Sequence, residues 1–228
     1  MKDAGGPWHR DFWRLDLQKF DAWHELPPYP VPTTVAGEFR GFSMAVHEDK
    51  AYMFTGRPEV DFFDLISNKW GSILTAFKRD DEKPDPASWP YPGKELSEYT
   101  MQLVDGKMYI FGGTNYDISP ACDLFVVLDI ATRRWTRLSG TVKPSPDHLR
   151  PGPRSFPVSW VNKKRDTIFV MFGVAESTPR SFSYGDVWSW SIPDGHWRRE
   201  RMTGNIPCSR SEMAYSYVSS CQNIITEI

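Results

Sequence analysis

A chain of 228 residues, with 40% hydrophobic and 25% charged residues, suits one large domain or two small ones around a buried core. Its net charge of −2 and the lack of any basic run longer than Lys163-Lys164-Arg165 exclude a broad nucleic-acid-binding surface. No apolar stretch reaches the roughly 18 residues that a membrane helix needs, so we expect neither a nucleic acid nor a membrane as partner.

The first predicted strands lie in residues 11–26. Trp13, Leu15 and Leu17 alternate with polar residues there, which gives one apolar face with the period of a strand, and Trp23 follows. Aromatic residues make up 14% of the whole chain, beside 19 prolines and 16 glycines, and this balance favours strands separated by turns. We therefore expect an all-β fold that begins with two strands.

Residues 40–75 contain the first complete unit. Two apolar runs, SMAV at 43–46 and AYMFTG at 51–56, are joined by a turn-like sequence, and the second run ends in glycine. A third strand is predicted around Phe63 and Leu65, and Trp70 opens a fourth. This order predicts an antiparallel meander of four short strands.

The same order of elements returns at 98–139 and at 154–202. In the first of these units Asp105-Gly106 stands between two apolar runs, which is a strong signal for a tight hairpin. Each unit again has a second run that ends in glycine and a tryptophan that opens its last strand. The tryptophans of the four units are separated by 47, 65 and 62 residues: Trp23, Trp70, Trp135 and Trp197.

The last predicted unit, 210–228, has only a first and a second strand, SEMAYSYV and IITEI, whereas 11–26 supplies only a third and a fourth. Two interpretations follow. The two half units pair and close a ring of four, or the chain is part of a larger ring. We favour the second, because a chain seldom ends within a strand.

Four-stranded meanders of about 50 residues in tandem are the signature of a β-propeller, in which each meander is one blade. Glycines are expected where the second strand of a blade leaves the crowded channel wall, and tryptophans are expected to pack between neighbouring blades. The predicted structural residues of the repeat are Gly56, Gly112, Gly113, Gly173, Trp23, Trp70, Trp135 and Trp197.

A hydrophobic run, Gly112-Gly113, a variable loop and Trp135 six residues after Asp129 resemble the kelch repeat, a family that includes galactose oxidase. Pro151-x-x-Arg154 and Pro207-x-x-Arg210, ahead of first strands, strengthen the resemblance. It implies a single domain over 1–228, a kelch-type β-propeller of four-stranded antiparallel blades, partial or four-bladed. It also implies a scaffold or adaptor that binds a protein or peptide.

The alternative function is a metal-dependent oxidoreductase or lyase like galactose oxidase. The five histidines are scattered, and none has the spacing of a metal ligand relative to another His or to a Cys. No nucleophile, phosphate-binding or dinucleotide-binding motif is present in the sequence. We therefore expect no enzyme activity, no metal and no cofactor.

Two further features have structural interpretations. Asp16, Asp64 and Asp129 recur at the end of a third strand, which suggests a hydrogen bond in a turn rather than acid–base chemistry. Cys122 lies beside Asp123, which favours a structural thiol over a reactive one. With three cysteines, no CxxC motif and no secretion signal at the N-terminus, we expect a reducing compartment, the cytoplasm or the nucleus.

The candidate contact residues lie where long connections gather, at 75–97, 139–153 and 175–184. Arginines precede three first strands, and they either brace neighbouring blades or bind an acidic or phosphorylated peptide. An aromatic side chain and a third cationic side chain, from the connections that follow second strands, complete the predicted binding site. The predicted partner-binding residues are Arg40, Arg154, Arg210, Tyr116 and Arg180.

Overall fold

The computed structural model describes residues 10–19, 22–30, 42–77, 90–91, 95–115, 118, 121–143, 148–177, 180–212, 214–218 and 223–227. Every regular element in these residues is a β-strand, which confirms the predicted all-β class. The described residues contain no helix that could cross a membrane.

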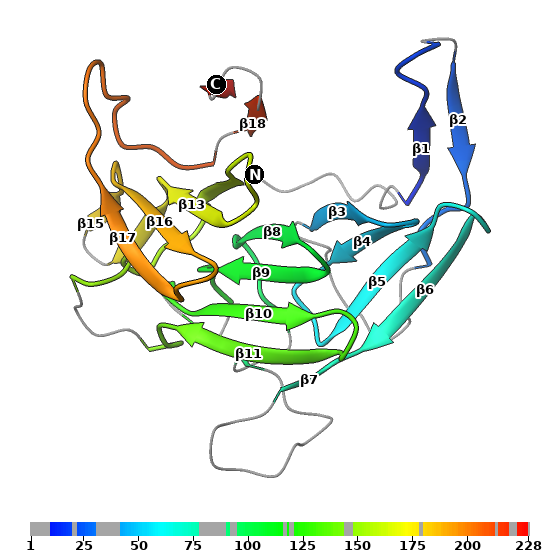
Figure 1. The fold of residues 1–228 in the computed structure, drawn as a ribbon, viewed down its shortest axis with the longest axis horizontal. Helices are drawn as coiled ribbons and strands as arrows, with labels where there is room; N and C mark the ends of the chain where they lie inside the picture. Colours follow the sequence, from blue (N-terminus) through cyan, green and yellow to red (C-terminus); the bar gives the residue numbers. More distant parts are fainter. Residues whose placement is uncertain are drawn as a thin grey trace.

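Three sheets of four or more strands follow one another along the chain (Figure 1). The first sheet has the order of the chain, and every neighbouring pair in it is antiparallel. It lies within the predicted unit 40–75. Its strands are β3 (Ser43–His47), β4 (Lys50–Phe54), β5 (Glu59–Asp64) and β6 (Lys69–Leu74).

The second sheet repeats this meander within 98–139. It also gains a fifth strand at its outer edge, β7 (Ala76–Phe77), which pairs in parallel with the last strand and belongs to the connection from the previous sheet. The sequence did not predict this strand. The meander consists of β8 (Thr100–Val104), β9 (Lys107–Phe111), β10 (Phe125–Asp129) and β11 (Arg134–Ser139).

The third sheet lies within 154–202 and holds an inserted hairpin. Residues 175–184 were predicted to be a loop, and this was wrong. They form most of β14 (Val174–Ser177) and β15 (Arg180–Ser183), which pair with each other. The sheet itself consists of β12 (Val158–Val161), β13 (Thr167–Met171), β16 (Val187–Ser191) and β17 (His196–Glu200).

Separate two-stranded ribbons flank the three sheets. One is β1 (Phe12–Leu15) with β2 (Trp23–Leu26), and the other is β18 (Ala214–Val218) with β19 (Asn223–Glu227). The two ribbons lie apart from each other on the upper side of the view in Figure 1, and neither is paired with the other in the sheets described.

The sheets are arranged like blades around an axis. In the second sheet β8 lies toward the middle of the molecule and β11 toward the outside (Figure 1), and β8 contacts both other first strands, β3 and β12. The hairpin predicted at Asp105-Gly106 is present, with φ of 48° and 73° at the two residues. Such a pair of positive φ values is typical of the tight turn that joins two twisted strands.

The hydrophobic core lies between neighbouring blades. One cluster joins Tyr52 and Phe54 of the first sheet to Met108 and Ile110 of the second. A second cluster joins Tyr109 and Phe111 of the second sheet to Ile168, Trp188 and Trp190 of the third. The second sheet therefore buries both of its faces, and blade stacking supplies the burial that a lone four-stranded meander lacks.

The repeated tryptophans bind the preceding blade. Trp135 and Trp197 are 2% and 9% exposed, and their indole Nε1 atoms donate to Thr75 Oγ1 at 2.6 Å and to Ser139 Oγ at 2.8 Å. Trp70 donates in the same way to the backbone oxygen of Pro27, at 2.8 Å. Each acceptor is the last residue of the outer strand of the preceding blade or the residue after it. The indole therefore links two neighbouring blades at their outer edges.

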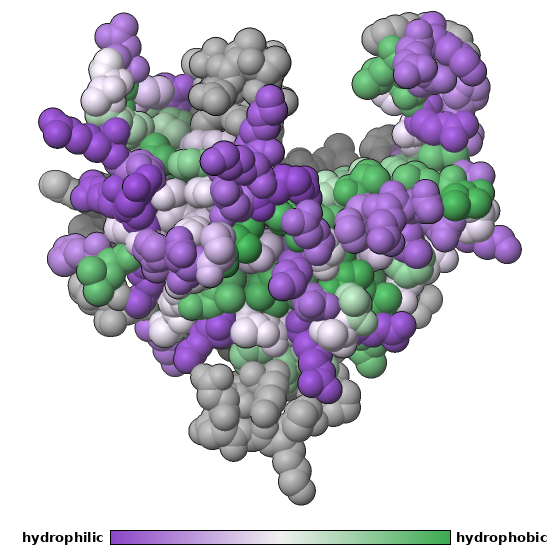
Figure 2. All heavy atoms as spheres, in the orientation of Figure 1, coloured by the Kyte–Doolittle hydropathy of each residue, from purple (hydrophilic) through white to green (hydrophobic). Residues whose placement is uncertain are grey.

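Trp23 departs from this pattern. It is 63% exposed, and the prediction that all four tryptophans pack between blades was wrong for this residue. Among the described residues, no sheet lies against the side of the β1–β2 ribbon that would correspond to a preceding blade. Met44 of β3 is 43% exposed, whereas Met101, which has the same place in β8, is 8% exposed. Met101 packs against the complete first sheet, but the blade before the first sheet consists only of the β1–β2 ribbon among the described residues. Figure 2 shows green hydrophobic surface over this first sheet.

The repeat glycines allow close approach between blades. Gly56 has a φ of +75°, and a Cβ there would lie 1.8 Å from the backbone oxygen of Leu96. Gly113 and Gly173 have φ of +94° and +95°, and their amides donate to the backbone oxygens of Arg154 and Arg210, both at 3.0 Å. The matching bonds place Arg154 and Arg210 at equivalent positions in successive blades.

Candidate functional site

In a blade, the connection from second to third strand and the connection to the next blade lie at the same end. We call this end the loop-bearing face. The β14–β15 hairpin belongs to it, and so do the residues between β11 and β12 and between β17 and β18. The short turns from first to second and from third to fourth strands lie at the opposite end.

A groove of about 730 Å³ opens on the loop-bearing face. Its volume is typical of a site that holds a small ligand or a short peptide. One wall comes from the connection between β11 and β12, and the other from the β14–β15 hairpin, the outer strands of the third sheet and the residues after β17. Its lining residues include Asp123, His148, Arg150, Phe182, Tyr184, Asp186, Trp188, Arg199, Glu200 and Ile206.

Arg154 lies beneath this groove with its side chain 0% exposed. Its Nη1 and Nη2 atoms donate to the two carboxylate oxygens of Asp186, at 2.8 and 3.3 Å, and Nη1 also donates to the backbone oxygen of Phe172. The guanidinium stacks on the ring of Tyr184, 3.8 Å from its centroid. Arg154 thus braces its own blade, and its predicted exposure to a peptide was wrong, because its donors already bind Asp186 and the backbone.

Asp186 is fixed from two sides. Burial would raise the pKa of its carboxyl group, but hydrogen bonds from Arg154 and from Trp188 Nε1, at 2.7 Å, hold that pKa below its ordinary value. The positive charge of Arg199 lowers the pKa further. Asp186 is therefore ionised at neutral pH and orders the floor of the groove.

The other carboxylates of the groove are also paired. Asp123 accepts from Arg150 Nε at 2.7 Å, and Glu200 accepts from Arg198 Nη2 at 2.7 Å. With Asp186 bound to Arg154, each negative charge has a positive partner. Arg199 is exposed, and no ion pair of its side chain is seen among the described residues. Once Arg154 and Arg198 are counted with the carboxylates that they bind, Arg199 is the positive charge left over in the groove.

The β14–β15 side of the groove supplies exposed apolar surface. Phe182 is 60% exposed and meets Tyr184 edge to face, with ring centroids 5.0 Å apart. Ile206, from the residues after β17, is 52% exposed. Because Tyr184 is held by Arg154, the aromatic pair is positioned by the core of the blade.

The other predicted contact residues have different outcomes. Arg210 is half-buried, with Nε donating to the backbone oxygen of Cys208 at 3.1 Å and the guanidinium 5.6 Å from the Phe172 ring. Arg40 and Tyr116 lie outside the described residues, and of Arg180 the structure describes only the backbone, in β15. A role for these four in binding a partner stays a prediction.

Sequence reasoning missed Phe182, Asp186 and Arg199. Arg199 directly follows an exposed arginine and precedes a glutamate in an outer strand, which looks like ordinary surface charge. Phe182 lies in a segment that the sequence predicts to be a connection. The alternation of Phe182 and Tyr184 with serines, SFSY, was the available signal for a strand.

The repeated aspartates have the role expected of them. Asp16, Asp64 and Asp129 accept backbone hydrogen bonds in the turn after the third strand, from Gln18, Ser67 and Thr132 among others. These bonds lower the pKa of Asp64 and of Asp129. In the third sheet Ser191 Oγ takes the same place and accepts from the amide of Asp194.

Cys122 is fully buried, and burial together with the charge of Asp123 raises the pKa of its thiol to about 12. Cys208 is exposed and unpaired, and Cys221 lies outside the described residues. Within the described part of the chain, no three His, Cys, Asp or Glu side chains gather closely enough to hold a metal ion.

Comparison with known proteins identifies the repeat. Residues 96–140 match the model of the Kelch motif, and no curated protein matches the chain. The solved structure of YjhT, a kelch-type propeller protein, matches with a TM-score of 0.56 and 16% identity, over 83% of this chain and 57% of that one. The chain thus spans less than two thirds of YjhT, and this likeness shows the fold. The predicted kelch resemblance and β-propeller fold are both confirmed.

Proposed function

We propose that this chain, which carries a kelch motif in a β-propeller fold, is a protein-interaction scaffold or adaptor that binds its partner on the loop-bearing face. The groove is the observation that carries the proposal. Exposed Phe182 and Ile206 stand there beside polar groups that ion pairs hold in place. Apolar anchors next to ordered polar groups are typical of sites where proteins bind one another.

The charges of the groove favour an acidic or phosphorylated peptide. Asp123, Asp186 and Glu200 are each neutralised by an arginine, which leaves the exposed Arg199 to attract an anion. A guanidinium binds a carboxylate or a phosphate through short, charge-assisted hydrogen bonds. This proposal keeps the expected class of partner and moves the contact from Arg154 to Arg199.

Binding is a better proposal than catalysis for these residues. A general acid or base needs a proton to exchange with substrate near neutral pH. The groove carboxylates instead accept hydrogen bonds from guanidinium groups and serve to fix side chains. We also propose a reducing compartment, the cytoplasm or the nucleus, because Cys122 and Cys208 are unpaired thiols.

The test is binding of a purified partner to a groove variant. A partner is first identified by affinity capture on the wild-type protein, and its dissociation constant is then measured. The double variant Phe182→Ser, Arg199→Glu should weaken binding by about tenfold or more, since an apolar anchor and a charge-assisted contact are both lost. Both side chains are exposed, so the melting temperature should stay nearly unchanged.

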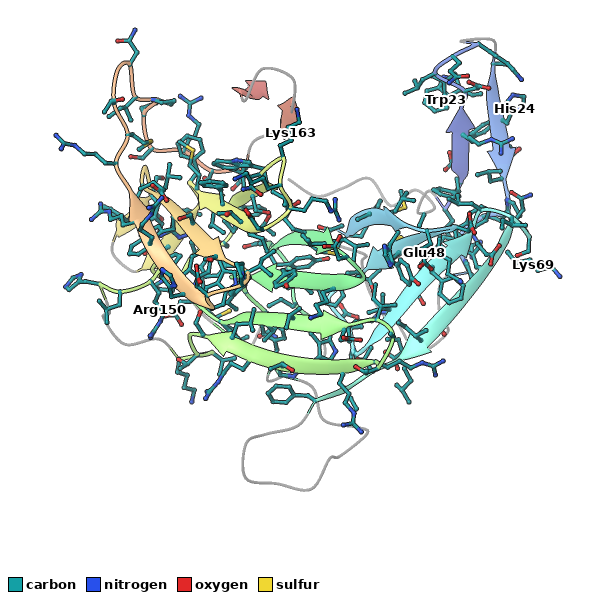
Figure 3. All side chains as sticks on the ribbon, in the orientation of Figure 1. Trp23, His24, Glu48, Lys69, Arg150 and Lys163 are labelled. Atoms are coloured by element: carbon teal, nitrogen blue, oxygen red, sulfur yellow. The ribbon has the colours of Figure 1, made fainter. Side chains whose placement is uncertain are left out.

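The matched control is Ile66→Ser, Lys69→Glu. These residues are also an exposed apolar and an exposed cationic side chain, but they lie at the turn between β5 and β6, at the opposite end of a blade. Figure 3 shows Lys69 pointing outward on one side of the molecule and Arg150 of the groove on another. If both double variants weaken partner binding equally, or if neither weakens it, the groove is not the binding site.

A further inference from the structure

The mouth of the central channel is a second hollow on the loop-bearing face. A cavity of about 430 Å³ opens where the first strands of the three blades begin, and it shares no lining residue with the groove. Its lining residues are Ser43, Tyr99, Thr100, Phe156, Pro157, Val158 and Glu212.

The backbone around this mouth has a repeated and unusual conformation. Glu98 and Phe156 lie two residues before β8 and β12, Glu212 lies two residues before β18, and their φ angles are 59°, 52° and 55°. A positive φ is uncommon outside glycine and is an outlier for a bulky residue such as Phe156. The amide of Phe156 donates to the backbone oxygen of Glu98 at 2.7 Å, so this conformation links one blade to the next around the axis.

The mouth is negatively charged. Glu212 is exposed and is the charged residue among the described residues that line the cavity. Arg154 and Arg210, which precede β12 and β18, are engaged elsewhere, because Arg154 binds Asp186 and Arg210 lies over Phe172.

The mouth is also aromatic. Phe156 and Tyr99 both line it, and Tyr99 is fixed by a hydrogen bond from its hydroxyl to the backbone oxygen of Phe54, at 2.7 Å. Aromatic faces attract cations, and the attraction grows when the cation leaves water. A carboxylate beside aromatic rings is therefore suited to a cationic group with an apolar stem.

We infer that the channel mouth binds the side chain of an arginine or lysine from a protein partner. Glu212 accepts the charge-assisted hydrogen bond, and Phe156 contacts the cation or its stem. This goes beyond the proposed function, in which the groove takes up an anion. The loop-bearing face then carries a positive and a negative site. A partner that carries both charges would bind this face in a defined orientation.

The probe for this inference is the capped peptide acetyl-Gly-Arg-Gly-amide, with the citrulline peptide as its neutral isostere. Binding is followed by NMR shifts of the Ser43, Thr100 and Val158 amides. The arginine peptide should bind at least about fivefold more tightly than the citrulline peptide, and Glu212→Gln should remove that preference. Phe156→Asn, which tolerates a positive φ, should weaken the arginine peptide by a similar factor.

Two further variants make the outcome specific. Glu95→Gln removes an exposed carboxylate from the connection before β8 and should leave peptide binding unchanged. Arg199→Glu, in the groove, should also leave it unchanged, so that failure of the mouth and failure of the groove are separate results. Equal binding of the arginine and citrulline peptides, or full binding by Glu212→Gln, would overturn the inference.

Discussion

Asp186 binds a guanidinium that has no exposure to solvent, and this pair sets the behaviour of the groove at the scale of single residues. A buried charge is tolerated only when it is paired and hydrogen-bonded. Arg154 has Asp186, two backbone oxygens and the Tyr184 ring around it. Removal of the carboxylate would leave a positive charge enclosed in the blade.

The variant Asp186→Asn should therefore destabilise the protein by about 3–5 kcal/mol at pH 7, the usual cost of breaking a buried ion pair on one side. Urea unfolding measures this loss. Arg199→Gln, which removes an exposed guanidinium beside the same groove, should cost no more than about 0.5 kcal/mol. A small loss of unfolding free energy for Asp186→Asn would show that Arg154 is not buried in solution as it is in the structure.

The same pair predicts a dependence on pH. The folded-state pKa of Asp186 is lowered, so its contribution to stability is complete above the unfolded value of about 3.9 and is lost as pH falls through the folded value. The difference in stability between wild type and Asp186→Asn should shrink from pH 6 to pH 3. A difference that stays constant over this range would contradict the assignment.

Cys122 should be nearly inert. Burial raises the pKa of its thiol to about 12, so at pH 8 almost none of it is the reactive thiolate, and the side chain is also enclosed. Cys208 is exposed and should react readily with a thiol reagent in the native state. Mass spectrometry of the labelled peptides compares the two sites, and rapid native labelling of Cys122 would contradict the packing of this loop.

At the scale of elements, the edge of each blade is held by an indole. The Nε1 atoms of Trp70, Trp135 and Trp197 donate to Pro27, Thr75 and Ser139, at the end of the preceding blade. Sequence spacing predicted these tryptophans because the repeat places one at the start of every last strand. It did not predict the exposure of Trp23, which depends on whether another blade stands beside it.

The variants Trp135→Ala and Trp197→Ala should each lose about 3–5 kcal/mol of unfolding free energy, as large buried aromatic residues do. Trp23→Ala, at a residue that is 63% exposed, should lose no more than about 0.5 kcal/mol. Urea unfolding of the three variants provides the comparison. Similar losses at Trp23 and Trp135 would mean that Trp23 is packed in solution, against a blade that the structure does not place there.

Whether an element could be predicted depends on how far apart in the chain its interacting residues lie. Turn aspartates such as Asp64 act within a few residues, and the alternation of a strand is local, so both were visible in the sequence. The pairing of β7 with β11 and of Arg154 with Asp186 joins residues that are distant in the chain. No local pattern encodes such contacts, and for this reason the groove was missed while the blades were found.

At the scale of the whole molecule, the propeller separates its two ends by function. The turns from third to fourth strands are short and fixed by an aspartate or, in the third sheet, by Ser191. The loop-bearing face holds the inserted hairpin, the groove and the channel mouth. Variation in connections on a rigid scaffold is the usual way in which a repeated fold gains a binding site. The central claim is that a partner contacts the loop-bearing face alone.

Site-specific photocrosslinking tests that claim most directly. A photoreactive amino acid is placed at Phe182 or Ile206 on the loop-bearing face, and at Ile66 or Leu65 on the opposite turn, all of them exposed positions. The purified partner should form crosslinks from the first two positions and none from the second two. Crosslinks from Ile66 or Leu65, or a lack of crosslinks from both Phe182 and Ile206, would contradict the account.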